Sequence, residues 1–542
     1  MRRTRVGLAV LAAASLGSLS ALTGAPAQAA GASFTFRHTH LQPNNSYGEP
    51  SLAVSDTGKI IVCTPGGPGT NVWYSSDDGH TFGKSNTSSA NGGGDCELEV
   101  LPNGDVLNAD LEVYASNVHI SHDSGKTWSE VSTPNSPYNE EDPGAVGLEQ
   151  DRQWFAHSPD GNNVYLVYHD FAAEAEFYAS SSDAGKTWDY TNAANPVTGA
   201  DQAAAPGAAK TPAQGDAASL IDQGVNTFSG PMLVSPDGKD LYVVYSISDA
   251  QSNVTDGTPP FGHSKGIVVA HKGPEDSSFT NKYAVTSAAG EGNGAIFSWG
   301  TVDKAGNVYV LYNSDKGSTG HFHTYYVYST DKAKTWSAPV KVDSDALDSG
   351  VHIYSTGAAG APGVLDMAWY ETPAASSDDK TAMWHAQFAQ IRDANTANPK
   401  IVTARLSDDD IHKGQICLSG LLCAVTSGDR SLLDFFELAI GPDGMAQVAY
   451  ADNFEALQGK GEVVWAKQTT GASALSSTVT NPPPVTGGGT GTGSGTGSGT
   501  GSGSGSGSGG GLATTGLGTI VPLAALALLT GAALLRRRRQ HS

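Results

Sequence analysis

The sequence has little positive charge. Lysine and arginine together number 31, against 54 aspartates and glutamates, and the formal net charge is −23. Proteins that bind nucleic acids or anionic membranes electrostatically need concentrated lysine and arginine. The composition therefore argues against nucleic acid as a partner, and it is also what a soluble exported protein commonly has.

Cysteine is scarce, with four residues, and no two are spaced as Cys-x-x-Cys. The absence of this spacing argues against a zinc site of the usual kind. Cys417 and Cys423 bracket a short loop, so we expect them to pair and to leave Cys63 with Cys96. The sequence also lacks Gly-x-Ser-x-Gly, His-Glu-x-x-His and a phosphate-binding glycine loop, which removes several common enzyme classes.

The first 30 residues have the three parts of a secretory signal peptide. Arg2, Arg3 and Arg5 make a positive start, residues 6–22 are apolar or small, and Ala27-Gln28-Ala29 offers a cleavage site. An uncleaved N-terminal membrane helix is the alternative. Export places the cysteines where disulfides can persist.

The other end of the chain has three successive segments. Residues 476–511 form a Pro-containing and then Gly/Ser/Thr-rich stretch, which predicts a flexible linker. Residues 512–542 then comprise a pentapeptide, an apolar run at 520–535 and four arginines at 536–539. An apolar run before a basic tail predicts a membrane helix with its basic end inside.

The pentapeptide Leu512-Ala513-Thr514-Thr515-Gly516 resembles the LAxTG variant of a sortase sorting signal. The resemblance implies cleavage between Thr515 and Gly516, covalent attachment to peptidoglycan, and only transient membrane insertion. Sortase would then be a partner, and the protein would be secreted and anchored to the cell wall. A plain tail-anchored protein is the alternative.

One pattern recurs in the remaining residues, 31–475: a short strand, a tight Gly-containing turn and a second apolar strand. Its seven copies predict seven hairpins, starting at Pro50, Cys96, Gln153, Pro231, Phe297, Ile353 and Asp434. A second element, S-x-D-x-G-x-T-W, follows four of them, with its aspartates at Asp77, Asp123, Asp183 and Asp331. In the last of these copies Ala333 replaces the glycine, so we expect a distorted turn there.

This second element is the Asp box, and here the sequence resembles sialidases and other bacterial-neuraminidase-repeat propellers. The resemblance implies an all-β propeller of four-stranded blades, in which the Asp boxes are structural. Seven hairpins predict seven blades, six being the alternative. Residues 33–38 are expected to supply the missing outer strand of the last blade and so close the ring.

Ligand-binding residues of a propeller are expected just before the inner hairpins, around the channel mouth. The charged residues in these positions are Glu49, Asp95, Asp151, Arg152, Asp429, Arg430 and Asp434. Arginine binds a carboxylate bidentately, and nearby carboxylates can act as general acid or base in glycoside cleavage. We therefore consider Asp151, Arg152, Asp429 and Arg430 as catalytic candidates, and Glu49, Asp95 and Asp434 as ligand-binding candidates. The alternative is that these charges pair with each other to hold blades in register.

The sialidase resemblance further implies three arginines on a substrate carboxylate, a tyrosine nucleophile with a glutamate partner, and an aspartate acid/base. The sequence departs from this set. Residues 31–475 contain five arginines, Arg37, Arg152, Arg392, Arg405 and Arg430. The family's Arg-Ile-Pro is absent, Arg392 and Arg405 fall in the expected outer strands of blade six, and no tyrosine stands in a nucleophile context.

No cofactor is expected. Ca²⁺ is possible at residues 408–410 or 140–142, since carboxylate oxygens suit it, although acidic surface loops look the same without metal. His321 and His323 alternate on an expected strand, but two histidines without a third ligand are thin evidence for a metal.

Three functional hypotheses follow. The first is a surface propeller that recognises or processes a glycan or glycoprotein without sialidase chemistry. The second is an active exo-sialidase or other glycoside hydrolase, and the third is a non-catalytic structural or adhesive wall protein. The incomplete arginine set favours the first over a true sialidase.

Overall fold

The computed structural model describes residues 34–42, 47–66, 69–87, 92–112, 116–132, 150–170, 175–188, 225–249, 264–288, 291–293, 297–315, 321–344, 349–418, 423, 428–454 and 461–477. The predicted signal peptide, the sorting signal and the linker beyond residue 477 lie outside these ranges. Within them, no helix is long and apolar enough to cross a membrane.

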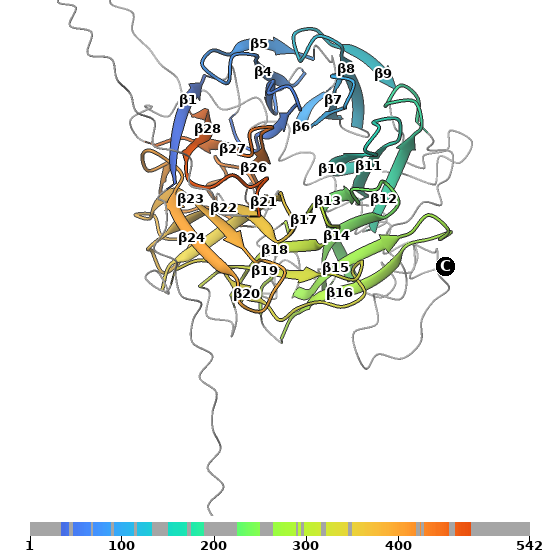
Figure 1. Cartoon of the computed structure of the whole chain (residues 1–542). Helices are drawn as coiled ribbons and strands as arrows, with labels where there is room; N and C mark the ends of the chain where they lie inside the picture. Colours follow the sequence, from blue (N-terminus) through green and yellow to red (C-terminus); the bar gives the residue numbers. More distant parts are fainter. Residues whose placement is uncertain are drawn as a thin grey trace, which may run out of the picture.

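Seven antiparallel sheets form a ring, as Figure 1 shows. Each sheet is one blade of a β-propeller, which confirms the predicted architecture and blade number. Every predicted hairpin supplies the two inner strands of a blade.

The first three blades contain the following strands. Blade 1 has β2 (Ser51–Val54), β3 (Ile60–Thr64), β4 (Asn71–Ser75) and β5 (Gly83–Asn86). Blade 2 has β6 (Gly92–Val100), β7 (Val106–Glu112), β8 (Ser116–Ser121) and β9 (Ser129–Ser132). Blade 3 has β10 (Gln150–His157), β11 (Val164–Asp170) and β12 (Ala175–Ser181) in the described part of the chain.

The other four blades continue the order around the ring. Blade 4 has β13 (Val225–Val234), β14 (Leu241–Asp249), β15 (Ser264–Lys272) and β16 (Thr280–Thr286). Blade 5 has β17 (Trp299–Val302), β18 (Val308–Ser314), β19 (His323–Ser329) and β20 (Val340–Lys341). Blade 6 has β21 (Val351–Ala359), β22 (Val364–Thr372), β23 (Met383–Arg392) and β24 (Lys400–Arg405), with β25 (His412–Lys413) beside β23. Blade 7 has β26 (Glu437–Ile440), β27 (Ala446–Asp452), β28 (Glu462–Thr470) and β1 (Thr35–Leu41).

The N-terminal strand closes the ring. β1 pairs antiparallel with β28, placing Thr39 opposite Trp465 and Leu41 opposite Val463. Blue β1 therefore lies beside red β28 in Figure 1. This confirms the predicted closure, with the strand running from residue 35 to residue 41.

The blades pack face to face through apolar side chains, and both predicted disulfides form. The largest fully buried side chains include Trp73, Trp154, Trp369, Trp384 and Trp465. The Cys63–Cys96 disulfide joins β3 of blade 1 to β6 of blade 2. The Cys417–Cys423 disulfide closes a loop with a sequence separation of 6.

Each Asp box is held by hydrogen bonds to its aspartate. In blade 1, the Thr81 amide donates to Asp77 Oδ1 over 3.0 Å and the Thr81 hydroxyl to Oδ2 over 2.6 Å. The Ser75 hydroxyl donates to Oδ1 over 2.8 Å. These bonds from Thr81 and Ser75 lower the pKa of Asp77 to about 2, as expected for a carboxylate that accepts several bonds. The role is structural.

The Asp-box turn at Ala333 is not distorted, so the prediction made for it is wrong. Ala333 has φ 59°, and its amide donates to Ser329 Oγ over 2.9 Å. In the glycine-containing box of blade 2, Gly125 has φ 85° and donates to Ser121 over 2.8 Å. The hydrogen bonds of the box are strong enough to hold alanine in the left-handed region, which glycine adopts at lower cost.

The two ends of the channel are built from different loops. We call the end with the Asp boxes and the turns inside the inner hairpins the turn face, and the other end the mouth face. On the turn face, Lys59 of one inner turn donates to Ser124 of the neighbouring Asp box over 2.7 Å. Lys332 of another box donates to Asp240 over 2.8 Å. These contacts place the inner turns and the Asp boxes on one face of the propeller.

Candidate functional site

Four of the predicted residues meet on the mouth face. Arg430 forms an ion pair with Asp434, and its guanidinium lies 3.9 Å from Glu49 Oε1. The Asp434 amide donates to the same glutamate oxygen over 3.1 Å. Glu49 also hydrogen-bonds to Asp95. We call Glu49, Asp95, Arg430 and Asp434 the mouth cluster.

The mouth cluster is mostly shielded from solvent. The side chains of Glu49 and Asp434 are 3% and 5% exposed, whereas that of Arg430 is 24% exposed. Burial, followed by the charges of Asp95 and Asp434, raises the pKa of Glu49 well above its usual value. The protonated form of Glu49 is therefore favoured more than in a free glutamate, and Arg430 is the group that an incoming ligand meets.

The backbone around the channel is strained at related positions. Glu49, Arg152 and Tyr354 have φ of 50°, 43° and 57°, in the left-handed region that such residues avoid. The strand pairing shifts register at the second and third of them, between Asp151 and Trp154 and between Ile353 and Thr356. These β-bulges redirect side chains at the inner strand starts.

Tyr354 lies beside the mouth cluster, and the sequence analysis did not single it out. It is 3% exposed, and its hydroxyl has no hydrogen-bond partner within the described residues. Burial, then the charges of Asp434 and Glu49, raise its pKa well above the usual value. A nucleophile needs the opposite shift or an adjacent base. Neither the positive φ of Tyr354 nor its approach to Arg430, which is distant in the chain, leaves a recognisable pattern in the sequence.

Arg152 does not join the mouth cluster. Its guanidinium donates to Glu97 Oε2 over 3.0 Å and lies 3.9 Å from the ring centroids of both Trp154 and Phe435. The side chain is 3% exposed. A guanidinium stacked between two rings and bound to a carboxylate is fixed in place, and the catalytic candidate Arg152 thus forms an internal ion pair in this structure.

Glu97 faces a second buried carboxyl group, Glu437. Leu52 N–H and Ser51 Oγ donate to Glu437 over 2.7 and 2.9 Å. Burial, followed by the charge of Glu437, raises the pKa of Glu97 well above its usual value. The Glu97 and Glu437 side chains also hydrogen-bond to each other, which requires a proton on one of the two carboxyl groups.

A cavity of about 380 Å³ opens toward the turn face beside this pair. Its lining includes Glu97, Glu437, His157, Trp154 and Trp299. Trp154 packs edge-on against Trp299 and Phe435, with centroids 5.0 and 5.2 Å apart. Aromatic side chains therefore lie beside the ion pair of Arg152 inside the channel.

Two further predicted site residues are Asp429 and Asp151. Asp429 Oδ2 lies 3.9 Å from His412 Nε2, and its Oδ1 accepts the Ser431 amide over 2.9 Å. Asp151 belongs to β10, where its backbone pairs with His169, but its side chain lies outside the described residues.

Among the described residues, the arginines do not converge. Arg37 bonds to Asp78 and Gly79, Arg392 to the carbonyl oxygens of Ser473 and Ser476, and Arg405 to Asp410. Only Arg430 stands in the mouth cluster. The arrangement lacks the carboxylate clamp that the sialidase resemblance implies.

The candidate calcium loop at 408–410 does not gather its carboxylates around one point. Asp410 accepts from Arg405 over 2.8 Å, and Asp408 lies 3.5 Å from His40 and 3.8 Å from His38. Residues 140–142 lie outside the described residues.

Two histidines and an aspartate form a group on the mouth face, of which the sequence analysis named only one member. His323 Nδ1 lies 2.9 Å from Asp343 Oδ2, and His352 Nδ1 lies 3.3 Å from the same oxygen. These three residues offer ligand atoms that all lie within 4.8 Å of one another. The sequence analysis named His323 with His321, but the partners of His323 come from more distant positions.

The comparisons with known proteins do not identify the function of this chain. No protein-family model matches the chain, and no curated protein matches it. The chain is similar in fold to the polysaccharide lyase Uly1, at 10% identity and a TM-score of 0.45, covering 78% of this chain and 90% of the other.

Two other solved structures show the same level of likeness. The Penicillium chrysogenum alpha-L-arabinanase complexed with arabinobiose has 15% identity and a TM-score of 0.37, covering 68% of this chain and 91% of the other. The intramolecular trans-sialidase from Ruminococcus gnavus, in complex with oseltamivir carboxylate, has 12% identity and a TM-score of 0.37, covering 79% and 95%. All these TM-scores are below 0.5, so the likeness carries no argument about chemistry.

Proposed function

We propose that the chain is a cell-surface propeller that binds glycans at the mouth cluster, and that its ligand is a glycan without an essential carboxylate. The observation that carries the proposal is the charge balance of the cluster. One arginine stands among Glu49, Asp95 and Asp434, so these buried carboxyl groups already balance its charge and leave no excess positive charge for an anionic sugar. Sugar hydroxyls, in contrast, can donate to carboxylates and accept from Arg430.

A glycan array with the full-length chain tests this proposal. Arg430→Ala should abolish binding to neutral glycans because it removes the accessible donor, and Asp434→Asn should weaken binding because it removes the charge that holds the Arg430 guanidinium. Arg405→Ala is the matched control, since Arg405 pairs with Asp410 on the outside of blade 6 and should leave binding intact. Binding that survives both cluster variants would place the ligand elsewhere.

Glycoside hydrolysis is the second candidate, and the raised pKa of Glu49 favours it. A carboxyl group that stays protonated near neutral pH can act as a general acid. The measurement is turnover of a panel of fluorogenic glycosides, with Glu49→Gln beside the parent. Turnover that Glu49→Gln abolishes would make the protein a glycoside hydrolase, whereas no turnover of any sugar leaves glycan binding as the function.

The sorting-signal resemblance adds a location to this proposal. Attachment of Thr515 to peptidoglycan would hold the propeller outside the cell. Thr515→Ala should move the protein from the wall fraction, where muramidase releases it, to the membrane fraction. Equal wall retention in the variant would contradict sortase attachment.

A further inference from the structure

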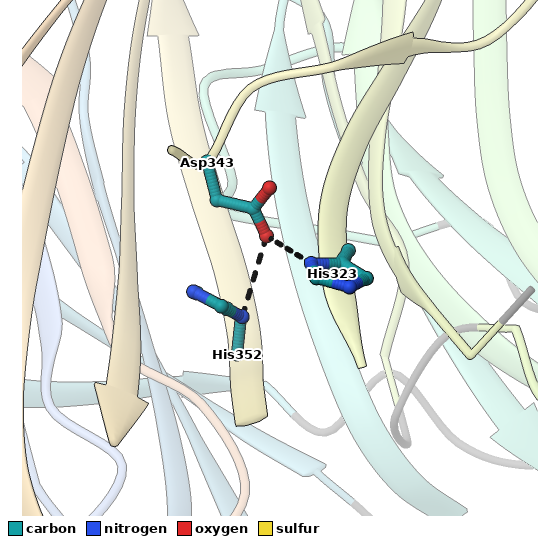
Figure 2. Close-up of side chains that lie close together, drawn as sticks. All are labelled: His323, Asp343 and His352. Carbon is teal, nitrogen blue, oxygen red and sulfur yellow. Dashed lines mark hydrogen bonds and ion pairs between the residues drawn. The ribbon is translucent and has the colours of Figure 1, made fainter. Parts of the chain in front are cut away.

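A second site on the mouth face lies at the boundary between blades 5 and 6. His323 is the first residue of β19, Asp343 follows β20 by two residues, and His352 is the second residue of β21. Figure 2 shows both imidazole rings turned toward one oxygen of the Asp343 carboxylate. The three side chains thus converge from three separate segments of the chain.

We propose that His323, Asp343 and His352 bind a divalent transition-metal ion, with Zn²⁺ as the best fit. Donors bound to a tetrahedral zinc at about 2.1 Å stand roughly 3.4 Å apart. The two nitrogen-to-oxygen distances here are 2.9 and 3.3 Å. Small rotations of the side chains would therefore admit the ion.

The ligand set also suits such an ion chemically. Two imidazoles and one carboxylate are ligands that zinc takes in proteins, whereas Ca²⁺ prefers oxygen donors throughout. Asp343 and His352 are fully buried and His323 is 12% exposed. Access is therefore from the side of His323, and three protein ligands leave a fourth position for water or a ligand.

The surroundings of His352 supply the outer contact that a zinc-bound histidine needs. His352 Nε2 lies 3.4 Å from Glu371 Oε2. Trp369 Nε1 and His385 Nε2 hold the Glu371 carboxylate at 2.7 and 2.9 Å. With the metal on Nδ1, the proton moves to Nε2 and faces this carboxylate, the arrangement that orients many metal-binding histidines.

Without metal, the same groups form a hydrogen-bonded network. His352 Nδ1 then donates to the Phe322 carbonyl oxygen over 2.8 Å, and the Thr324 amide donates to Asp343 over 3.0 Å. Lys341 Nζ lies 3.7 Å from Asp343 Oδ1 and opposes the approach of a cation. Removal of the lysine charge should therefore strengthen the binding of a metal ion. In a purely structural network, the same change would remove an ion pair of Asp343 and weaken the network.

The test is calorimetric titration of untagged full-length protein, first treated with chelator, with ZnCl₂. We expect one ion per chain and no comparable binding of CaCl₂. His323→Ala and Asp343→Asn should weaken zinc binding at least about tenfold, and Lys341→Gln should strengthen it. His122→Ala is the matched control, because His122 is 62% exposed on the turn face and pairs with Asp105.

Each outcome decides the proposal. Circular dichroism of the metal-free variants establishes that they are folded, and His323→Gln, which can still hydrogen-bond to Asp343, replaces His323→Ala if that variant unfolds. Cobalt(II) should give visible absorption bands in the parent protein that the His323 variant lacks. Absence of zinc binding by the folded parent, or equal affinity in the parent and all variants, would overturn the site.

Discussion

The Arg152 guanidinium donates a 3.0 Å hydrogen bond to the carboxylate of Glu97, from the inner strand of blade 3 to that of blade 2. Glu97 in turn approaches Glu437 of blade 7. One cation therefore helps three blades to place their carboxyl groups inside the channel. Charges that pair in this way fix the relative position of the blades, and the Arg152 side chain is only 3% exposed.

Arg152→Ala should lower the free energy of unfolding by about 3 kcal/mol, because it leaves buried carboxyl groups without their cation. Glycan affinity per folded molecule should not change. Urea denaturation measures the first quantity and the glycan array the second. Arg405→Ala, an exposed ion pair, should cost no more than about 1 kcal/mol. A stable Arg152→Ala protein without glycan binding would instead support a role of Arg152 in the site, where the sequence analysis placed it as a catalytic candidate.

Tyr354→Phe should leave the protein as stable as the parent or slightly more stable. The buried hydroxyl has no hydrogen-bond partner within the described residues, so its removal strands no group. Because the pKa of Tyr354 is raised, we also expect glycan binding, and any glycoside turnover, to stay within about threefold of the parent. Loss of turnover by two orders of magnitude would identify Tyr354 as a nucleophile instead.

The repeats were predictable from the sequence because their signals are local. The glycine of a hairpin turn and the serine, aspartate and threonine of an Asp box lie within eight residues, and their hydrogen bonds, such as Thr81 to Asp77, stay inside that window. The closing strand β1 followed from the missing fourth strand of blade 7.

The site was predictable only in part, because its contacts join distant segments. The start of each inner strand located Glu49, Arg152 and Arg430, but not where their side chains point. Arg152 has a positive φ beside a bulge and its side chain meets Glu97, whereas Arg430 meets Asp434. The side chains of His323, Asp343 and His352 meet across a blade boundary, so no fixed spacing in the sequence indicates that they form a site.

Asp366 should make stability fall as pH rises from about 4 to about 7. Burial raises the pKa of this fully buried carboxyl from 3.8 to about 7. The folded state therefore binds one more proton than the unfolded state in this window, and stability decreases with pH. The loss reaches roughly 4 kcal/mol, at about 1.4 kcal/mol per unit.

Asp366→Asn isolates this contribution, since the amide keeps the shape of the side chain without its titration. The difference in unfolding free energy between parent and variant, measured in urea at pH 5 and pH 8, should shift toward the variant at pH 8. An identical difference at both pH values would show that Asp366 does not carry the proton.

The two disulfides should contribute unequally to stability. Cross-linking restricts the unfolded chain more when the closed loop is longer, and the sequence separations are 33 for Cys63–Cys96 and 6 for Cys417–Cys423. The chain-entropy relation gives about 4 kcal/mol for the first and about 2 kcal/mol for the second. The double variants Cys63→Ala/Cys96→Ala and Cys417→Ala/Cys423→Ala, compared by urea denaturation, measure the two contributions.

The first bond also ties blade 1 to blade 2, so its loss should lower the unfolding midpoint more than the loss of the second bond. A larger loss from the second pair would instead mean that the short loop holds the strand starts of blade 7, with Arg430 among them, in place.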